Sequence, residues 1–94
     1  MSLLRLSVQT RGPACHEITA EITRWLREAG AGEGVLTVFV RHTSCSLLIQ
    51  ENADPDVQRD LLAWLARIAP PADHPEMAYL THRAEGPDDM PAHL

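Results

Sequence analysis

The feature that most constrains this chain is a polar stretch of twenty residues, 41–60, between two apolar patterns. Residues 35–40 before it are rich in β-branched side chains and predict a strand buried on both faces. After it, apolar residues recur at helical spacing up to Ala69. The stretch holds a histidine beside two hydroxyls, a cysteine, a Glu-Asn pair and three aspartates. Because residues this polar are rarely buried in a core, the stretch predicts the lining of a site.

Two segments have the apolar periodicity of amphipathic helices, residues 16–29 and 55–69. Gly30 follows the first where a C-terminal glycine commonly ends a helix. Asp54 and Pro55 suit the N-cap and first position of the second, and two prolines end it at Pro70. The expected apolar stripes are Ile18, Ile22, Trp25, Leu26 and Ala29, and then Val57, Leu61, Trp64, Leu65 and Ile68.

Four further segments predict strands: residues 3–9, 35–40, 45–49 and 77–81. The order strand–helix–strand–strand–helix–strand predicts an α/β (α+β) fold, a compact mixed sheet with two helices. The sequence contains no repeat, no low-complexity tract and no long linker. Residues 1–94 are therefore expected to form a single domain.

The length of the chain limits the core that it can build. A chain of 94 residues buries about 60–65% of its unfolded surface, so small folds of this kind usually need disulfides, a metal or partner subunits. The only cysteines, Cys15 and Cys45, form no CxxC pair, and no secretory leader is recognisable. Disulfides are not expected, and the cytoplasm is the expected location. No apolar run approaches the roughly 18–20 residues of a membrane span.

The charge pattern excludes one class of partner. The net charge is −5, and the eight basic residues are all arginines, scattered along the chain rather than clustered. A nucleic-acid surface needs concentrated positive charge, so no nucleic-acid partner is expected. Isolated arginines still suit a small phosphate or carboxylate, because the guanidinium group binds such anions bidentately.

The first group of candidate site residues lies in the polar stretch. His42 suits a general base, a metal ligand or a phosphate donor; alternatively it is a surface histidine in a turn, where Thr43 and Ser44 bond the local backbone. Glu51 is expected to face a cleft, and Asp60 either turns into that cleft or is solvated. Cys45 is interpreted as a small buried hydrophobic residue rather than a nucleophile.

A second group of candidates lies near the C-terminal end. His82 and Glu85 form His-x-x-Glu, followed by Gly86, two aspartates and His93. The spacing in a loop is not the zinc signature H-E-x-x-H. His82 and His93 are nevertheless ligand types that suit zinc or a similar divalent ion, and both are candidate metal ligands.

Taken together, these motifs resemble the YjbQ family, also called UPF0047, whose members are described as secondary thiamine-phosphate synthase enzymes. The resemblance covers about residues 35–94. It implies a mixed α/β fold that assembles as a homotrimer, with a polar site of His, Glu and Asp residues. Asp89 stands where the family commonly carries Asn, and family members continue past this segment, so the domain is expected to be incomplete at its C-terminal end. The matching positions are His42, Thr43, Ser44, Glu51, Asn52, Asp54, Asp60, His82, Glu85, Gly86 and His93.

The resemblance leads to a first hypothesis, a thiamine-phosphate synthase-like transferase that acts on a small phosphorylated substrate. In that reaction a pyrimidine pyrophosphate ionises and a thiazole phosphate nitrogen attacks, so pyrophosphate charge must be neutralised. The residues expected to take part are His42, Thr43, Ser44, Glu51, Asp60, His82 and Glu85.

Within that hypothesis, a divalent metal, Mg²⁺ or Zn²⁺, would be held by Glu51, Asp54 or Asp60. Arg41, His42 and His82 would contact phosphate. The alternative is a trimeric module that binds a metal or small anion through His42, His82 and His93 without turnover. A third interpretation, a purely structural protein, predicts that these histidines are scattered in space.

Overall fold

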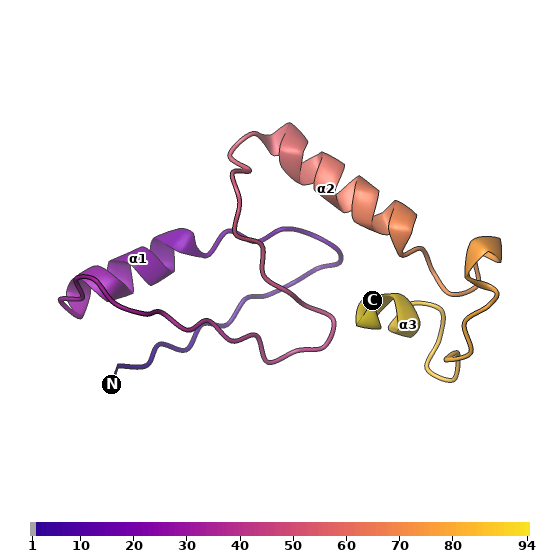
Figure 1. Ribbon diagram of the computed structural model, residues 1–94, viewed down its shortest axis with the longest axis horizontal. Coiled ribbons are helices and arrows are strands. Elements are labelled where there is room, and N and C mark those ends of the chain that lie inside the picture. Colours follow the sequence, from indigo (N-terminus) through magenta and orange to yellow (C-terminus); the bar gives the residue numbers. More distant parts are fainter. Residues whose placement is uncertain (1) are drawn as a thin grey trace. The chain divides into compact units, whose positions relative to one another are not determined.

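The computed structural model describes residues 2–94 and contains, within them, three α-helices and one 3-10 helix (Figure 1). The chain divides into two compact units, one ending at Val38 and the other spanning Phe39–Leu94. None of the described helices is long and apolar enough to cross a membrane. The helices are α1 (Thr19–Glu28), α2 (Pro55–Ile68), η1 (Pro75–Met77) and α3 (Asp89–His93).

The expected α/β (α+β) fold with a compact mixed sheet is wrong, because residues 2–94 contain no strand. Segments 3–9, 35–40 and 45–49 are irregular, and the last expected strand begins in η1 and continues as a turn. A strand needs a backbone ladder as well as apolar side chains, and none joins these segments. Their side chains are also uncovered: Val35 and Ile49 are each 97% exposed.

Helix α1 begins three residues later than the sequence pattern predicts, because the carboxylate of Glu17 accepts a hydrogen bond from the Thr19 amide at 3.2 Å. It ends at Glu28, one residue before the predicted end, and Gly30 adopts φ +69° in the turn that follows. The Gly30 amide donates to the Arg27 carbonyl and the Ala31 amide to the Leu26 carbonyl, which is the Schellman arrangement. Four residues of the predicted apolar stripe are half-buried, namely Ile18, Ile22, Trp25 and Leu26. The fifth, Ala29, is exposed.

The start of α1 should depend on pH. Hydrogen bonds from Thr19 hold the pKa of the Glu17 carboxyl below its ordinary value of 4.5. A lowered folded pKa means that this contribution is present above about pH 4.5 and is lost as the pH falls through the lowered value. The Thr19 amide shift, followed by NMR, should titrate in this range in the wild type and not in Glu17→Gln. An unchanged titration in that variant would assign the effect to another group.

Helix α2 follows the sequence prediction closely. The Asp54 carboxylate accepts a hydrogen bond from the Asp56 amide at 2.8 Å, and Pro55 is the first helical residue. Upstream of the cap, the Gln58 amide group donates to the Asn52 carbonyl at 3.0 Å. The expected core face is largely uncovered, since Trp64 is 58% and Ile68 52% exposed.

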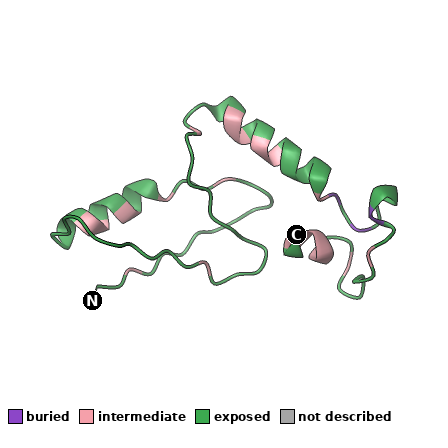
Figure 2. Ribbon diagram, viewed as in Figure 1, coloured by how far each residue is buried: buried purple, intermediate pink, exposed green. Residues whose placement is uncertain are grey.

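The described core lies just after α2. Pro70, Ala72 and Met77 are the buried residues of the second unit, in the segment that leads from α2 into η1 (Figure 2). His74 caps η1, because its Nδ1 accepts a hydrogen bond from the Glu76 amide at 3.1 Å. The most tightly packed part of this unit therefore immediately precedes the second group of candidate site residues.

Candidate functional site

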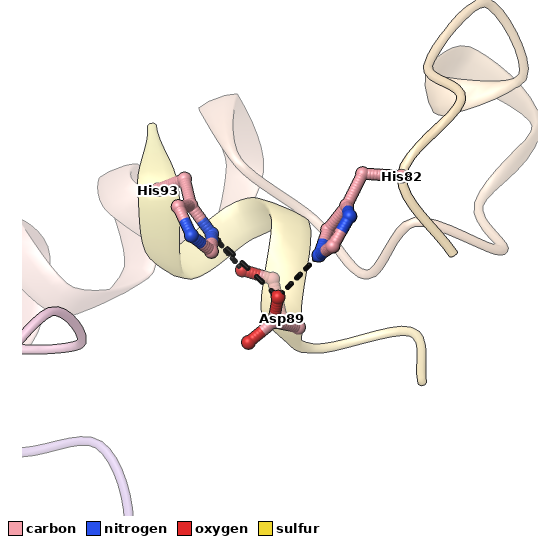
Figure 3. Close-up of side chains that lie close together, drawn as sticks. All are labelled: His82, Asp89 and His93. Carbon is pink, nitrogen blue, oxygen red and sulfur yellow. Dashed lines mark hydrogen bonds and ion pairs between the residues drawn. The ribbon is translucent and has the colours of Figure 1, made fainter. Parts of the chain in front are cut away.

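Three side chains converge at the C-terminal end of the second unit: His82, Asp89 and His93 (Figure 3). His82 Nε2 lies 2.5 Å from Asp89 Oδ2, and His93 Nδ1 lies 3.7 Å from the same oxygen. The two imidazole rings meet edge to face, with centroids 5.6 Å apart. Within residues 2–94, this is the one group of three or more His, Cys, Asp or Glu side chains whose ligand atoms lie close enough to share a metal ion, all within 4.8 Å.

Local structure explains two of the three positions. Asp89 and His93 are the first and last residues of α3, and residues four apart lie on the same face of a helix. The Nδ1 of His93 lies 2.8 Å from the Asp89 carbonyl oxygen. A carbonyl can only accept, so Nδ1 carries the proton and donates it, while Nε2 keeps its lone pair for a ligand or proton.

His82 comes from the loop before α3 and approaches Asp89 from outside the helix (Figure 3). Its hydrogen bond is the main reason why the pKa of the Asp89 carboxyl lies below its ordinary value. Glu85 and the positive charge of the two histidines lower that pKa further. Glu85 lies at the edge of the cluster, with its Oε2 3.8 Å from His82 Nε2. Asp89 is therefore the ionised centre of the group.

The donor set of the cluster fits a borderline divalent metal. Two imidazole nitrogens and one carboxylate oxygen make up the three protein ligands typical of catalytic zinc, whereas magnesium prefers oxygen ligands alone. Ligand atoms on one zinc ion stand at most about 4.2 Å apart, given bonds of about 2.1 Å. The separation of 2.5 Å between His82 Nε2 and Asp89 Oδ2 lies within this limit. The ligand atom of His93 would be Nε2, because Nδ1 of that ring donates to the Asp89 carbonyl.

The first group of candidates does not belong to this cluster. His42 lies in an exposed turn, where its Nδ1 accepts a hydrogen bond from the Ser44 amide at 3.0 Å. Thr43, Glu51 and Asp60 are exposed. Cys45, expected to be buried, is also exposed, since the segment that was to cover it forms no sheet.

The hydrogen bond from the Ser44 amide limits the chemical roles that the His42 side chain can take. Because Nδ1 accepts the amide proton, Nε2 carries the ring proton of the neutral imidazole. In this geometry His42 offers a hydrogen-bond donor to an anionic oxygen. Three roles were considered for His42: general base, metal ligand and phosphate donor. This geometry favours the phosphate donor.

Sequence reasoning left two residues of this region out of its site. Asp89 was named only as a departure from the family resemblance, although its spacing of four residues from His93 was a usable signal if the segment is helical. Arg83 had no such signal, because it contacts carbonyl groups that lie up to eleven residues away.

Comparison with known proteins gives one consistent result. The family described as UPF0047 protein YjbQ-like matches residues 4–94 of this chain. A UPF0047 protein from Synechocystis sp. is 44% identical over 89 residues, which cover 95% of this chain and 58% of that relative. The UPF0047 protein YjbQ of Escherichia coli O157:H7 is 37% identical over 92 residues, 97% of this chain and 62% of the relative. The chain thus spans about six-tenths of the length of these relatives. No solved structure matches it.

Proposed function

Because this chain belongs to the YjbQ-like UPF0047 family, we propose that it carries part of an enzyme site for a small phosphorylated substrate. The reaction that we propose is a transfer of the thiamine-phosphate synthase type. The observation that supports a site here is the convergence of His82, Asp89 and His93 on a common point. Groups that can bind a cation suit a substrate whose phosphates carry concentrated negative charge.

The chain's own residues would hold and orient the reacting groups. A divalent metal bound by His82, Asp89 and His93 would neutralise charge as pyrophosphate leaves. Zn²⁺ fits this donor set better than Mg²⁺. His42 would donate from Nε2 to a phosphate oxygen, because the Ser44 amide occupies its other ring nitrogen. Glu51 and Asp60 remain candidates for contacts elsewhere on the substrate.

Two substitutions at His42 test this proposal, because each keeps the hydrogen-bonding function of only one ring nitrogen. Asparagine places an oxygen near the position of Nδ1 and keeps the acceptor for Ser44, whereas glutamine places an N–H near Nε2 and keeps the donor. We expect His42→Asn to lower kcat/KM for thiamine phosphate formation by about 100-fold, the size of one lost oxyanion donor, and His42→Gln to lower it less.

His74→Asn is the matched control, because His74 also accepts an amide proton through Nδ1 but caps η1. It should leave the rate unchanged. Product formation is followed with the pyrimidine pyrophosphate and the thiazole phosphate as substrates. Equal rates for the wild type and both His42 variants would remove His42 from the mechanism, and no product from the wild type would refute this reaction.

A second candidate function is a metal- or small-anion-binding module without turnover. The observation that favours it is exposure: the side chains of His82 and His93 are 43% and 48% exposed. Sites that perform transfer chemistry usually exclude water, whereas a binding site tolerates it. Bound zinc in the purified protein, with no product from the two phosphorylated substrates, would favour the binding module.

Both candidates include assembly as a homotrimer. The support for assembly is the uncovered apolar surface of α2, where Trp64, Leu65 and Ile68 are each more than two-fifths exposed. Apolar patches of this kind commonly mark an interface between proteins. Sedimentation equilibrium would report the number of copies, and a monomer at all concentrations would remove assembly from the proposal.

A further inference from the structure

Arg83 makes more hydrogen bonds to the backbone than any other side chain in residues 2–94. Its Nε donates to the Leu80 carbonyl at 3.2 Å. One terminal nitrogen donates to the Ala72 carbonyl at 3.0 Å and the other to the Met77 carbonyl at 3.2 Å. All three nitrogens of the guanidinium group are thereby engaged. Arg83 is thus held inside its own loop, in contrast to an isolated arginine free to bind a phosphate.

These contacts close the loop that runs from Ala72 to Pro87. The Ala72 amide donates to the Pro87 carbonyl at 2.7 Å, while the Ala72 carbonyl accepts from Arg83. Ala72 is only 1% exposed, so both of its backbone groups are satisfied away from water. The segment before η1 is therefore joined to the segment before α3 at one residue, and Arg83 contributes one of the two bonds.

The same loop carries the candidate metal ligands at its edge. His82 immediately precedes Arg83, and Asp89 lies two residues after Pro87. The guanidinium group fixes the first of these positions, and the bond from Ala72 fixes the second. The 2.5 Å approach of His82 to Asp89 thus depends on a loop whose two arms meet at Ala72.

We propose that Arg83 is a positioning residue, which sets the separation of His82 from Asp89 and so preforms the cation site. This inference rests on the proposed function, because the cluster matters only if it binds a ligand. Arg83 is suited to the role because its planar group offers donors in a fixed fork and can bridge three carbonyls at once. A lysine ammonium offers a single point of charge on a flexible stem and cannot span the same three oxygens in that geometry.

The test compares Arg83→Lys and Arg83→Met with the wild-type chain, using Co²⁺ as a spectroscopic probe in place of zinc. We expect each variant to lower Co²⁺ affinity by about 10–100-fold, the loss typical of groups that orient metal ligands. The visible spectrum at saturating Co²⁺ should also change, since the ligands no longer meet at the same angles. Arg59→Lys and Arg59→Met are the matched controls, because Arg59 pairs only with Asp56 on the surface of α2.

A second measurement distinguishes a positioning role of Arg83 from a general loss of stability. It also distinguishes failure of that role from failure of the proposed metal site. In the metal-free protein, ¹⁵N NMR of the imidazole of His82 reports whether Nε2 still donates to Asp89. We expect this bond in the wild type and in the Arg59 variants, and its loss in the Arg83 variants while the α2 resonances are unchanged. If the wild type binds no Co²⁺, the metal site of the proposed function fails. If both Arg83 variants keep the His82–Asp89 bond and the wild-type spectrum, the positioning role fails.

Discussion

Replacing Asp89 with alanine is expected to reduce the affinity of this chain for Zn²⁺ by at least about 100-fold. Asp89 Oδ2 is the atom that both histidines approach, at 2.5 Å from His82 Nε2 and 3.7 Å from His93 Nδ1. Removing it would take away one of the three proposed ligands and the carboxylate that both rings approach. An aspartate carboxyl is already ionised at neutral pH, the form that binds a cation, and the hydrogen bond from His82 lowers the pKa of Asp89 further.

The Asp89→Asn variant separates the effect of losing the negative charge from the effect of losing the oxygen ligand. Asp89→Asn keeps an oxygen at nearly the same place but removes the negative charge, so we expect a smaller loss, about 10-fold. Asn is also the residue that the family resemblance associates with this position. This chain should accordingly bind a divalent cation more tightly than its own Asp89→Asn variant.

Isothermal titration of the purified, metal-free chain with Zn²⁺ measures the series. Asp88→Ala is the matched control, because Asp88 neighbours Asp89 but makes no side-chain cap bond to α3. It removes the same charge from the same turn, so a purely long-range electrostatic effect would weaken both variants equally. Equal affinities for Asp88→Ala and Asp89→Ala would show that Asp89 is not a ligand.

Helices α1 and α2 could be predicted from the sequence because their signals are local. The Asp54 cap, the proline at the first position of α2 and the Schellman turn at Gly30 each depend on residues within a few positions of one another. The sheet could not be predicted in the same way. β-branched residues favour extended backbone, but a ladder requires a partner segment at the correct register. Segment 35–40 has no such partner within the described residues.

The site shows the same division between local and distant determinants. His82 and His93 were predicted as metal ligands from residue type, and the structure brings them together in a group with Asp89. The role of Asp89 depends on its spacing of four residues from His93, which places both residues on one face where the segment is helical, as it is in α3. The contacts of Arg83 reach back to Ala72 across a folded loop, so sequence proximity gave no indication of them. His42 remains a candidate phosphate donor. The reason is local, because the hydrogen bond from the Ser44 amide within its own turn leaves Nε2 as the donor.

Replacing Met77 with alanine is expected to destabilise the second unit by about 2–3 kcal/mol, within the usual range for a buried methionine. Met77 is 4% exposed and lies in the 3-10 helix η1. Its carbonyl accepts from Arg83 at 3.2 Å and from the Leu80 amide at 3.0 Å. A cavity at this side chain would loosen the backbone that Arg83 holds, so the loss should reach the cation site as well as the core.

Urea unfolding, followed by NMR signals from residues 70–90, measures the loss for this unit. Met90→Ala is the matched control, because it makes the same chemical change at a half-buried position in α3. Met77→Leu, which conserves volume, should cost less than about 1.5 kcal/mol. If Met77→Ala costs no more than Met90→Ala, the segment around η1 is not the core of this unit. The approach of His82 to Asp89 would then have to be maintained by the Arg83 hydrogen bonds and the bond from the Ala72 amide to the Pro87 carbonyl.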